Sequence, residues 1–244
     1  MQQLDNLFRD PRPLVLTRLA LPAALTIVVL APHPDDFDAV GVSMRFLHDH
    51  GHTIHLAVLT SGASGVEDGF DGAHTAADKA AIREAEQRAS CHFFGLPPQR
   101  ISFLRLWEND DDGADRERLR AYLSSQRPDL VFLPHGNDTN HTHRRTYESV
   151  RAIAEQDRMK LWACLNRDAK TLSIRTDLYT DFGEEEATWK ACLLRFHRSQ
   201  HERNLHTRKH GFDERVLRLN REIATSVHGS SLPYAEAFEL QRFG

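Results

Sequence analysis

The chain alternates short apolar runs with longer amphipathic segments. The run at 26–31, Thr-Ile-Val-Val-Leu-Ala, is continuous and rich in β-branched residues. This pattern is typical of a strand that is buried on both faces of a parallel sheet. Residues 39–50 instead carry apolar side chains at helical spacing, and Gly51 follows as a helix end. These two segments predict a strand followed by a helix.

The same alternation continues along the chain. We expect further strands at 53–60, 101–106, 130–133, 160–165 and 172–176, and helices at 76–94, 115–126, 146–156 and 184–201. Residues 109–112 and 135–145 are expected to form polar loops. Strands alternating with helices of this length predict an α/β fold with a mostly parallel, open sheet and helices on both faces. A length of 244 residues suits one such domain over residues 1–244.

The composition is that of an ordinary globular protein and excludes several classes. A net charge of -4 gives no basic footprint for nucleic acid. Three scattered cysteines without a CxxC pair indicate a reducing compartment. Arg18 and Pro22 interrupt the apolar stretch at 14–31, which therefore suits neither a transmembrane segment nor a signal peptide. We expect a cytoplasmic protein.

Candidate chemistry begins where the strand at 26–31 ends. The chain continues as His33-Pro34-Asp35-Asp36, the HPDD motif. In open α/β sheets ligands bind beyond the carboxyl ends of the strands, and an imidazole and a carboxylate three residues apart can converge on one metal ion across a tight turn. Asp35 would remain available as a general base. The alternative is that the aspartates only cap the following helix.

A second strand end repeats this pattern. After the apolar run at 130–133 come His135, Asp138, Asn140, His141 and His143. Taken alone, this could be a solvated polar loop. Two His- and Asp-rich strand ends in one sheet instead predict a catalytic metal site, with zinc or another divalent ion that keeps one position open for water.

The chain resembles the PIG-L (LmbE-like) family of zinc-dependent N-deacetylases. Its opening motif, Ala-His-Pro-Asp-Asp-Glu, is similar to residues 31–37, and residues 138–143 resemble the second motif. Further similar segments are "LTSGASG", "IREAE", "WKACLLRFHRSQ" and "PYAEAFEL", at 59–65, 82–86, 189–200 and 233–240.

The resemblance implies a Rossmann-like fold and removal of the N-acetyl group from an N-acetylglucosamine-type sugar or its conjugate. It implies zinc ligands at His33, Asp36 and His143 and a general base at Asp35. It also implies that Arg83 contacts the substrate and that His197 lines the cleft. The partner is then a small N-acetylated amino sugar or a conjugate of it, and the enzyme could form a homo-oligomer.

Three positions depart from the family pattern. Phe37 replaces a glutamate, so that the hydrogen bonds of that glutamate are lost unless Asp38 supplies them. Asn140 and Thr142 replace a histidine and an aspartate that act on the oxyanion in some members. Asn140 or His141 would then be the catalytic hydrogen-bond donor.

Two other interpretations stay open from the sequence. Two histidines and a carboxylate are also the ligands of non-haem Fe(II) oxygenases, although an α/β chain does not suit the β-rich scaffold of that class. The departures at Phe37, Asn140 and Thr142 would also fit a metal-binding module of the same fold with impaired catalysis.

Overall fold

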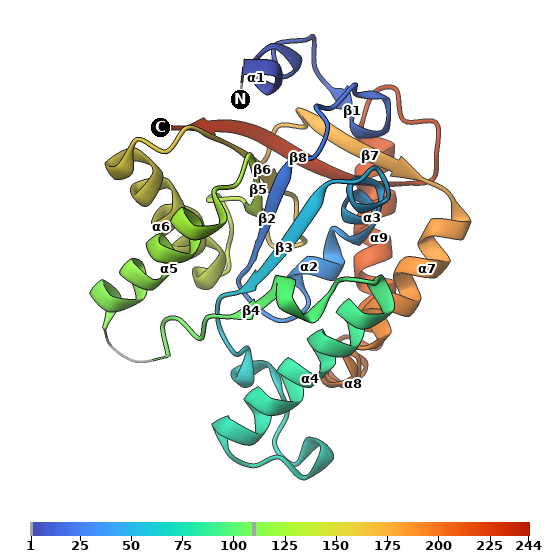
Figure 1. The fold of residues 1–244 in the computed structure, drawn as a ribbon. Helices are drawn as coiled ribbons and strands as arrows, with labels where there is room; N and C mark the ends of the chain where they lie inside the picture. Colours follow the sequence, from blue (N-terminus) through green and yellow to red (C-terminus); the bar gives the residue numbers. More distant parts are fainter. Residues whose placement is uncertain (1, 109–110) are drawn as a thin grey trace.

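An eight-stranded sheet forms the centre of the protein. We describe residues 2–108 and 111–244 of a computed structural model. The strand order is β1-β7-β8-β6-β5-β2-β3-β4, and only β8 runs antiparallel to its neighbours among the described strands. Figure 1 shows α5 and α6 on one side of this sheet and α3, α7 and α9 on the other. The predicted α/β class and mostly parallel sheet are confirmed.

The elements have the following bounds. The strands are β1 Leu14–Val15, β2 Thr26–Ala31, β3 Thr53–Val58, β4 Ile101–Phe103, β5 Leu130–Pro134, β6 Leu161–Asn166, β7 Leu178–Phe182 and β8 Tyr234–Phe243. The helices are α1 Gln2–Leu7, α2 Asp36–Ala39, α3 Gly41–Asp49, α4 Ala76–Phe94, α5 Asp112–Gln126, α6 His141–Asp157, α7 Glu184–Arg195, α8 Arg198–Arg208 and α9 Phe212–Ser226.

Several predicted boundaries differ from those in the structure. The strand expected at 172–176 is wrong, because the strand in this region is β7 at 178–182. The helix expected at 184–201 ends at Arg195, and a new helix starts at Arg198. The predicted polar loop at 135–145 ends at Asn140, whose side chain caps α6. Residues 109–110 of the predicted acidic loop lie outside the described part, while Asp112 already begins α5.

The unbroken apolar run of β2 is explained by burial on both faces. Ile27 and Val29 belong to the core between the sheet and α3. Val28 and Leu30 belong to the second core, under α5 and α6. A strand whose alternate side chains enter two different cores has no polar face, and this accounts for its continuous run of apolar residues.

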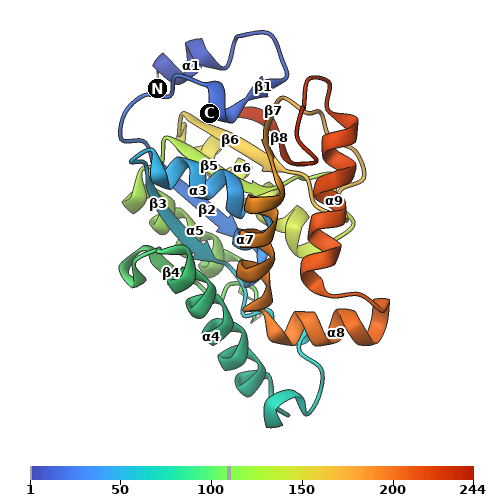
Figure 2. The same cartoon turned by 90° about the vertical axis from the view of Figure 1, so that its right-hand side faces the viewer.

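The strand order creates a crevice beside β2. The chain moves from β2 to β3 and β4 in one direction, and then returns to place β5 on the opposite side of β2. Such a reversal leaves room for a ligand beyond the carboxyl ends of the two strands at which it occurs. Both metal-ligand motifs predicted from the sequence follow these two strands. Figure 2 shows α8 and α9 standing beside this region.

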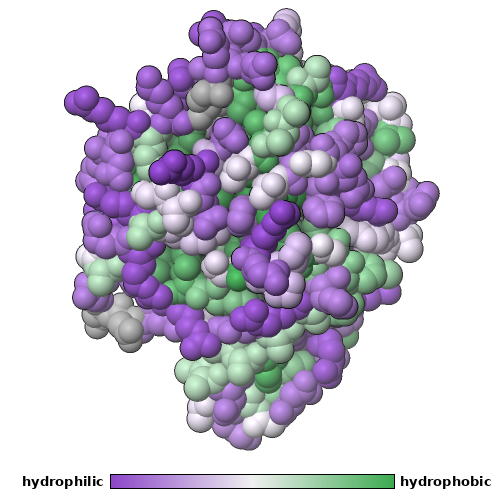
Figure 3. All heavy atoms as spheres, in the orientation of Figure 1, coloured by the Kyte–Doolittle hydropathy of each residue, from purple (hydrophilic) through white to green (hydrophobic). Residues whose placement is uncertain are grey.

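Polar residues dominate the face of the protein that is seen in the orientation of Figure 1. The face in Figure 3 is hydrophilic over most of its area, with apolar patches between. None of the described helices combines the length and the apolarity that a bilayer crossing requires.

A buried ion pair joins α7 to the last strand. Lys190 Nζ lies 2.6 Å from Glu236 Oε1 and 2.6 Å from the carbonyl oxygen of Ala39. Glu236 also accepts hydrogen bonds from the backbone N–H groups of Val42 and Ser43, at the start of α3. The pair therefore fixes the end of α2, the helix that follows the HPDD turn, and the start of α3.

Replacing Lys190 should destabilise the protein strongly. Lys190→Met leaves Glu236 buried without its cation, which should lower the free energy of unfolding by about 3–5 kcal/mol in urea titrations. The matched control is Arg151→Met, which breaks the exposed 2.7 Å pair with Glu155 and should leave the midpoint nearly unchanged. Equal shifts in the two variants would contradict this role for the buried pair.

Candidate metal centre and active site

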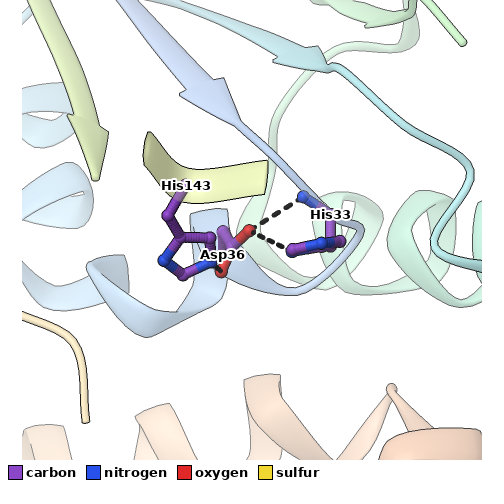
Figure 4. A group of neighbouring side chains, drawn as sticks. All are labelled: His33, Asp36 and His143. Carbon is purple, nitrogen blue, oxygen red and sulfur yellow. Dashed lines mark hydrogen bonds and ion pairs between the residues drawn. The ribbon is translucent and has the colours of Figure 1, made fainter. Parts of the chain in front are cut away.

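The HPDD turn folds back on itself at the end of β2. The Asp36 Oδ2 atom accepts a hydrogen bond from the backbone N–H of His33 at 2.8 Å and lies 3.2 Å from His33 Nδ1. Asp36 is also the first residue of α2, so its backbone is fixed by the helix. The turn thereby places the two predicted ligands next to each other, as Figure 4 shows.

Asp35 has an unusual backbone conformation between the two ligands. Its φ is 127°, in a region that residues other than glycine rarely adopt. Helix α4 holds it there: the Gln87 side chain accepts from the Asp35 backbone N–H at 3.0 Å, and Arg83 Nη2 lies 3.2 Å from Asp35 Oδ1. Arg83 also donates to the carbonyl oxygen of Pro34. This strained turn gives the Asp35 carboxylate a direction different from that of Asp36.

His143 enters the site from the first turn of α6. The helix starts early because Asn140 Oδ1 accepts from the Thr142 backbone N–H at 2.9 Å. The buried Asp138 carboxylate lies 3.2 Å from His143 Nδ1. Such a carboxylate fixes the neutral ring with its proton on Nδ1, so that the lone pair of Nε2 is available for a metal. Nε2 faces Asp36 Oδ1 at 3.7 Å.

The three predicted ligands meet in one place. His33, Asp36 and His143 each contribute an atom to a group whose members all lie within 4.8 Å of one another. Two imidazoles and a carboxylate suit zinc and other divalent transition metals, whose bonds to nitrogen are about 2.0–2.1 Å. Small side-chain movements would bring these donors to that distance, so the residues fit such an ion.

A second acidic group shares His143 with this site. Asp138, His143 and Asp168 also lie within 4.8 Å. Asp138 already holds the Nδ1 side of the ring, and Asp168 accepts a hydrogen bond from the Lys170 backbone N–H at 2.9 Å. We therefore interpret Asp138 as the group that orients His143.

The electrostatics distinguish the two neighbouring aspartates. Burial would raise the pKa of Asp36, but His143 and His33 hold it well below its usual range, so that Asp36 stays ionised. Burial raises the pKa of Asp35 in spite of the opposing charge of Arg83. A raised pKa suits a group that accepts and later returns a proton.

His197 does not lie where the family resemblance implied. Its side chain is fully buried, it is not among the residues that line the cleft, and its Nε2 contacts the Asp38 carboxylate. Ser90 donates to the same carboxylate at 2.9 Å, and Gln87 at 3.3 Å. Through Gln87 this network reaches Asp35, so that the structure gives His197 a supporting position behind the cleft.

The remaining positions that the sequence singled out lie partly in the core and partly in the cleft. Phe37 is fully buried and packs edge-on against Phe94 at 5.1 Å, so this position belongs to the core. Asp38 faces the His197 network and not the metal ligands. Asn140 lines the cleft, whereas His141 is exposed and does not. Of the two predicted donors, only Asn140 therefore reaches the cleft.

The ligand group opens into a cavity of about 650 Å³. This volume is within the usual range of small-molecule sites. Its inner part contains His33, Asp35, Asp36, Asn140 and His143. Residues of the segments 167–170 and 203–219 also line it, together with others that include Gly65, Arg83 and Glu236.

The profile of the GlcNAc-PI de-N-acetylase family, PIG-L, matches residues 28–154. The chain belongs to the PIG-L family. The matched region contains both strand-end motifs, and it ends in α6. The family suggested by the HPDD motif is thus confirmed.

Solved structures support the PIG-L fold over nearly the whole chain. An N,N'-diacetylchitobiose deacetylase from Pyrococcus horikoshii is 20% identical, with a TM-score of 0.72 over 98% of this chain and 92% of that one. A 4-carboxy-2-hydroxymuconate hydratase from Pseudomonas putida is 16% identical, with a TM-score of 0.67 over 90% and 96%. A zinc-inhibited teicoplanin deacetylase is 12% identical, with a TM-score of 0.65 over 88% and 98%. No curated protein matches the chain.

Sequence reasoning missed several supporting residues of this PIG-L site. The role of Asp138 as the partner of His143 had a signal, namely its position ahead of a histidine in a strand-end loop. Gln87 had none, because a glutamine in the middle of a helix does not indicate that it will hold a backbone N–H group 52 residues away. Tertiary structure alone brings α4 against the HPDD turn.

Metal analysis should test the ligand set directly. We expect about one divalent ion per wild-type chain and loss of most of it in His33→Ala. His92→Ala removes an exposed histidine of α4 and should leave the metal content unchanged. Elemental analysis that finds His33→Ala fully loaded would remove His33 from the ligand set.

The pH dependence of metal binding should depend on Asp138. Burial would lower the pKa of His143, but Asp36 and Asp138 raise it in the metal-free protein. Below this pKa the protonated ring cannot bind a metal, so affinity should fall as the pH falls.

In Asp138→Asn the pKa of His143 should be lower, and the midpoint, defined as the pH at which the affinity falls to half of its own high-pH value, should therefore move to lower pH. Affinity at high pH should decrease about 10- to 100-fold, since the ring is less well oriented. Asp49→Asn, an exposed change on α3, is the control in zinc titrations from about pH 5 to 8. An unmoved midpoint in Asp138→Asn would show that Asp138 does not control His143.

Proposed function

We propose that this protein is a metal-dependent N-deacetylase that hydrolyses the acetamide of an N-acetylglucosamine-type sugar or its conjugate. One observation carries the proposal: Asp35, a partly buried carboxylate outside the ligand group, is held beside His33, Asp36 and His143. A ligand set with an adjacent proton acceptor is what metal-assisted amide hydrolysis needs. Membership of the PIG-L family supports the same reaction.

The ligand group defines where the cofactor would be held. His33, Asp36 and His143 would bind zinc or another divalent ion. When bound, such an ion supplies Lewis-acid activation of water and of the acetamide carbonyl. Asp138 orients His143, and the turn hydrogen bonds orient Asp36, so the ligands are positioned before the ion arrives.

Asp35 is proposed as the general base and then the general acid. Its carboxylate takes a proton from the attacking water and returns it to the leaving amine, and the products are acetate and the free amine. Burial, which raises its pKa, makes the second transfer easier, and Arg83 at 3.2 Å keeps the carboxylate ionised before the first.

Asn140 is proposed as the donor to the tetrahedral oxyanion. Its Oδ1 accepts from Thr142 N–H, which directs the amide plane, and no described residue accepts from its Nδ2 group. A fixed N–H group at the cleft surface can stabilise negative charge that develops on the acetamide oxygen. This role replaces the histidine that other family members carry at the position.

Substituting Asp35 and Asp36 one at a time should distinguish the general base from the metal ligand. Asp35→Asn keeps the shape and removes the basic oxygen, so metal content should stay near wild type while kcat falls by roughly two to four orders of magnitude. Asp36→Ala should lose both metal and activity, because a ligand is gone. Metal analysis and amine release from N-acetylated amino sugars check both variants.

Two results would contradict these assignments. Metal loss in Asp35→Asn with retention in Asp36→Ala would exchange the roles of the two residues. Metal-loaded wild-type protein that releases no amine from any N-acetylated amino sugar would favour the interpretation as a binding module with impaired catalysis.

Arg83 should act on catalysis more than on substrate affinity. The sequence resemblance implied substrate contact, but the Arg83 side chain is 2% exposed and binds Asp35 and Glu86 at 3.2 and 3.3 Å. Arg83→Lys should therefore lower kcat about tenfold or more with a small change in KM. It should also shift the pH–rate profile, because the charge beside Asp35 moves. A large rise in KM with unchanged kcat would restore the substrate-binding role.

The oxygenase interpretation receives no support from the fold. It rested on two histidines and a carboxylate, and that class usually needs a β-rich scaffold, whereas the candidate ligands here lie at the carboxyl ends of two parallel strands of an α/β sheet. Activity that required iron, oxygen and 2-oxoglutarate would favour it over hydrolysis.

A further inference from the structure

Besides Arg83, which is paired with Asp35 and Glu86, five cationic side chains line the cleft. Arg203 and Arg208 come from α8, Arg215 comes from α9, and Arg167 and Lys170 come from the segment that follows β6. Three separate elements therefore direct positive charge at one cavity, next to the ligand group. The chain as a whole has a net charge of -4, so this concentration does not reflect a generally basic surface.

These five cations lack counter-ions. Over residues 2–108 and 111–244, none of them forms an ion pair. Arg203 donates only to the carbonyl oxygen of Gly65, at 3.3 Å, and Arg167 only to the hydroxyl of Ser226, at 3.3 Å. The side chains of Arg208, Arg215 and Lys170 make no hydrogen bond to a described residue.

The acidic side chains of the cleft are engaged elsewhere. Asp35 and Asp36 belong to the HPDD turn, and Glu236 is bound to Lys190. Asp168 accepts from the backbone N–H of Lys170 at 2.9 Å and caps its own loop. Among the described residues, none of these carboxylates forms an ion pair with any of the five cations.

Clustering like charges costs free energy that a bound anion would recover. The nearby charge of Arg215 lowers the pKa of Arg208. Partial burial and the charges of Arg203 and Arg218 lower this pKa further. In contrast, Arg195 at the end of α7 and Arg198 at the start of α8 do not line the cleft, and each pairs with an aspartate.

We infer that the substrate is anionic: the part of the N-acetylated molecule that lies away from the ligand group carries a phosphate or carboxylate group. This inference rests on the proposed deacetylase function for the position of the acetamide. Guanidinium groups bind such oxyanions through paired N–H donors, and Lys170 adds a point charge. The ligand group would then determine the reaction. The five cationic side chains, called the arginine wall below, would determine which substrate binds.

Matched substrates can test this inference. The neutral substrate is the methyl glycoside of N-acetylglucosamine, the phosphate substrate is N-acetylglucosamine 1-phosphate, and the carboxylate substrate is N-acetylmuramic acid. Release of amine gives kcat/KM for each. We expect at least one anionic substrate to be preferred about tenfold or more, with the preference shrinking as salt rises from about 0.05 to 0.5 M. The phosphate and carboxylate arms show which anion the wall accepts.

Variants then show which side chains cause the preference for anionic substrates. In Arg208→Gln/Arg215→Gln the ratio of anionic to neutral kcat/KM should fall about tenfold or more. Arg116→Gln removes an exposed arginine of α5 that does not line the cleft and should keep the wild-type ratio. A merely structural defect would lower kcat/KM for the anionic and the neutral substrates alike, and so would leave this ratio unchanged.

The outcomes separate this inference from the proposed function. Equal kcat/KM for neutral and anionic substrates, or a ratio that the double variant leaves unchanged, overturns the inference while deacetylation stands. Failure of all three substrates to react removes the proposed function instead. Calorimetry of Asp35→Asn with N-acetylglucosamine 1-phosphate then still decides the inference: binding that the double variant abolishes supports it, and no binding at low salt overturns it.

Discussion

The carboxylate of Asp36 is the interaction on which the site depends. One of its oxygens binds the backbone N–H of His33 at 2.8 Å, and the other lies 3.7 Å from His143 Nε2. It thereby joins the end of β2 to the first turn of α6, which follows β5. Since β2 and β5 are adjacent parallel strands, a single short side chain can connect their two loops. The crevice at this reversal of strand order supplies the space in front of it.

Around Asp36, successive layers of buried polar contacts support the site. Asp138 orients His143, and Gln87 and Arg83 hold the strained backbone and the carboxylate of Asp35. Burying these charges would be costly without partners, and each has one. These paired charges contrast with the five cations of the cleft, which form no ion pair with a described residue. A division of this kind allows one reaction centre to serve different substrates through changes in α8, α9 and the segment after β6.

Much of this arrangement could be predicted from the sequence, and the reason is local. The apolar run at 26–31 and the HPDD turn lie together in sequence, so the strand, its end and the ligands His33 and Asp36 follow from adjacent residues. The second strand end offered His135, His141 and His143 alike, and only the family resemblance singled out His143. His197, Gln87 and the arginine wall depend on how α4, α8 and α9 pack against the sheet, which no periodicity specifies. The split between α7 and α8 and the late strand β7 were missed for the same reason.

Anomalous X-ray diffraction from crystals containing zinc tests the central claim most directly. We expect one strong peak at the zinc absorption edge, bound by His33, Asp36 and His143, with the Asp35 carboxylate nearby but outside the bonding distance of about 2.0–2.2 Å. A peak bound by Asp35, or one between Asp138 and Asp168 without His33, would contradict this ligand set.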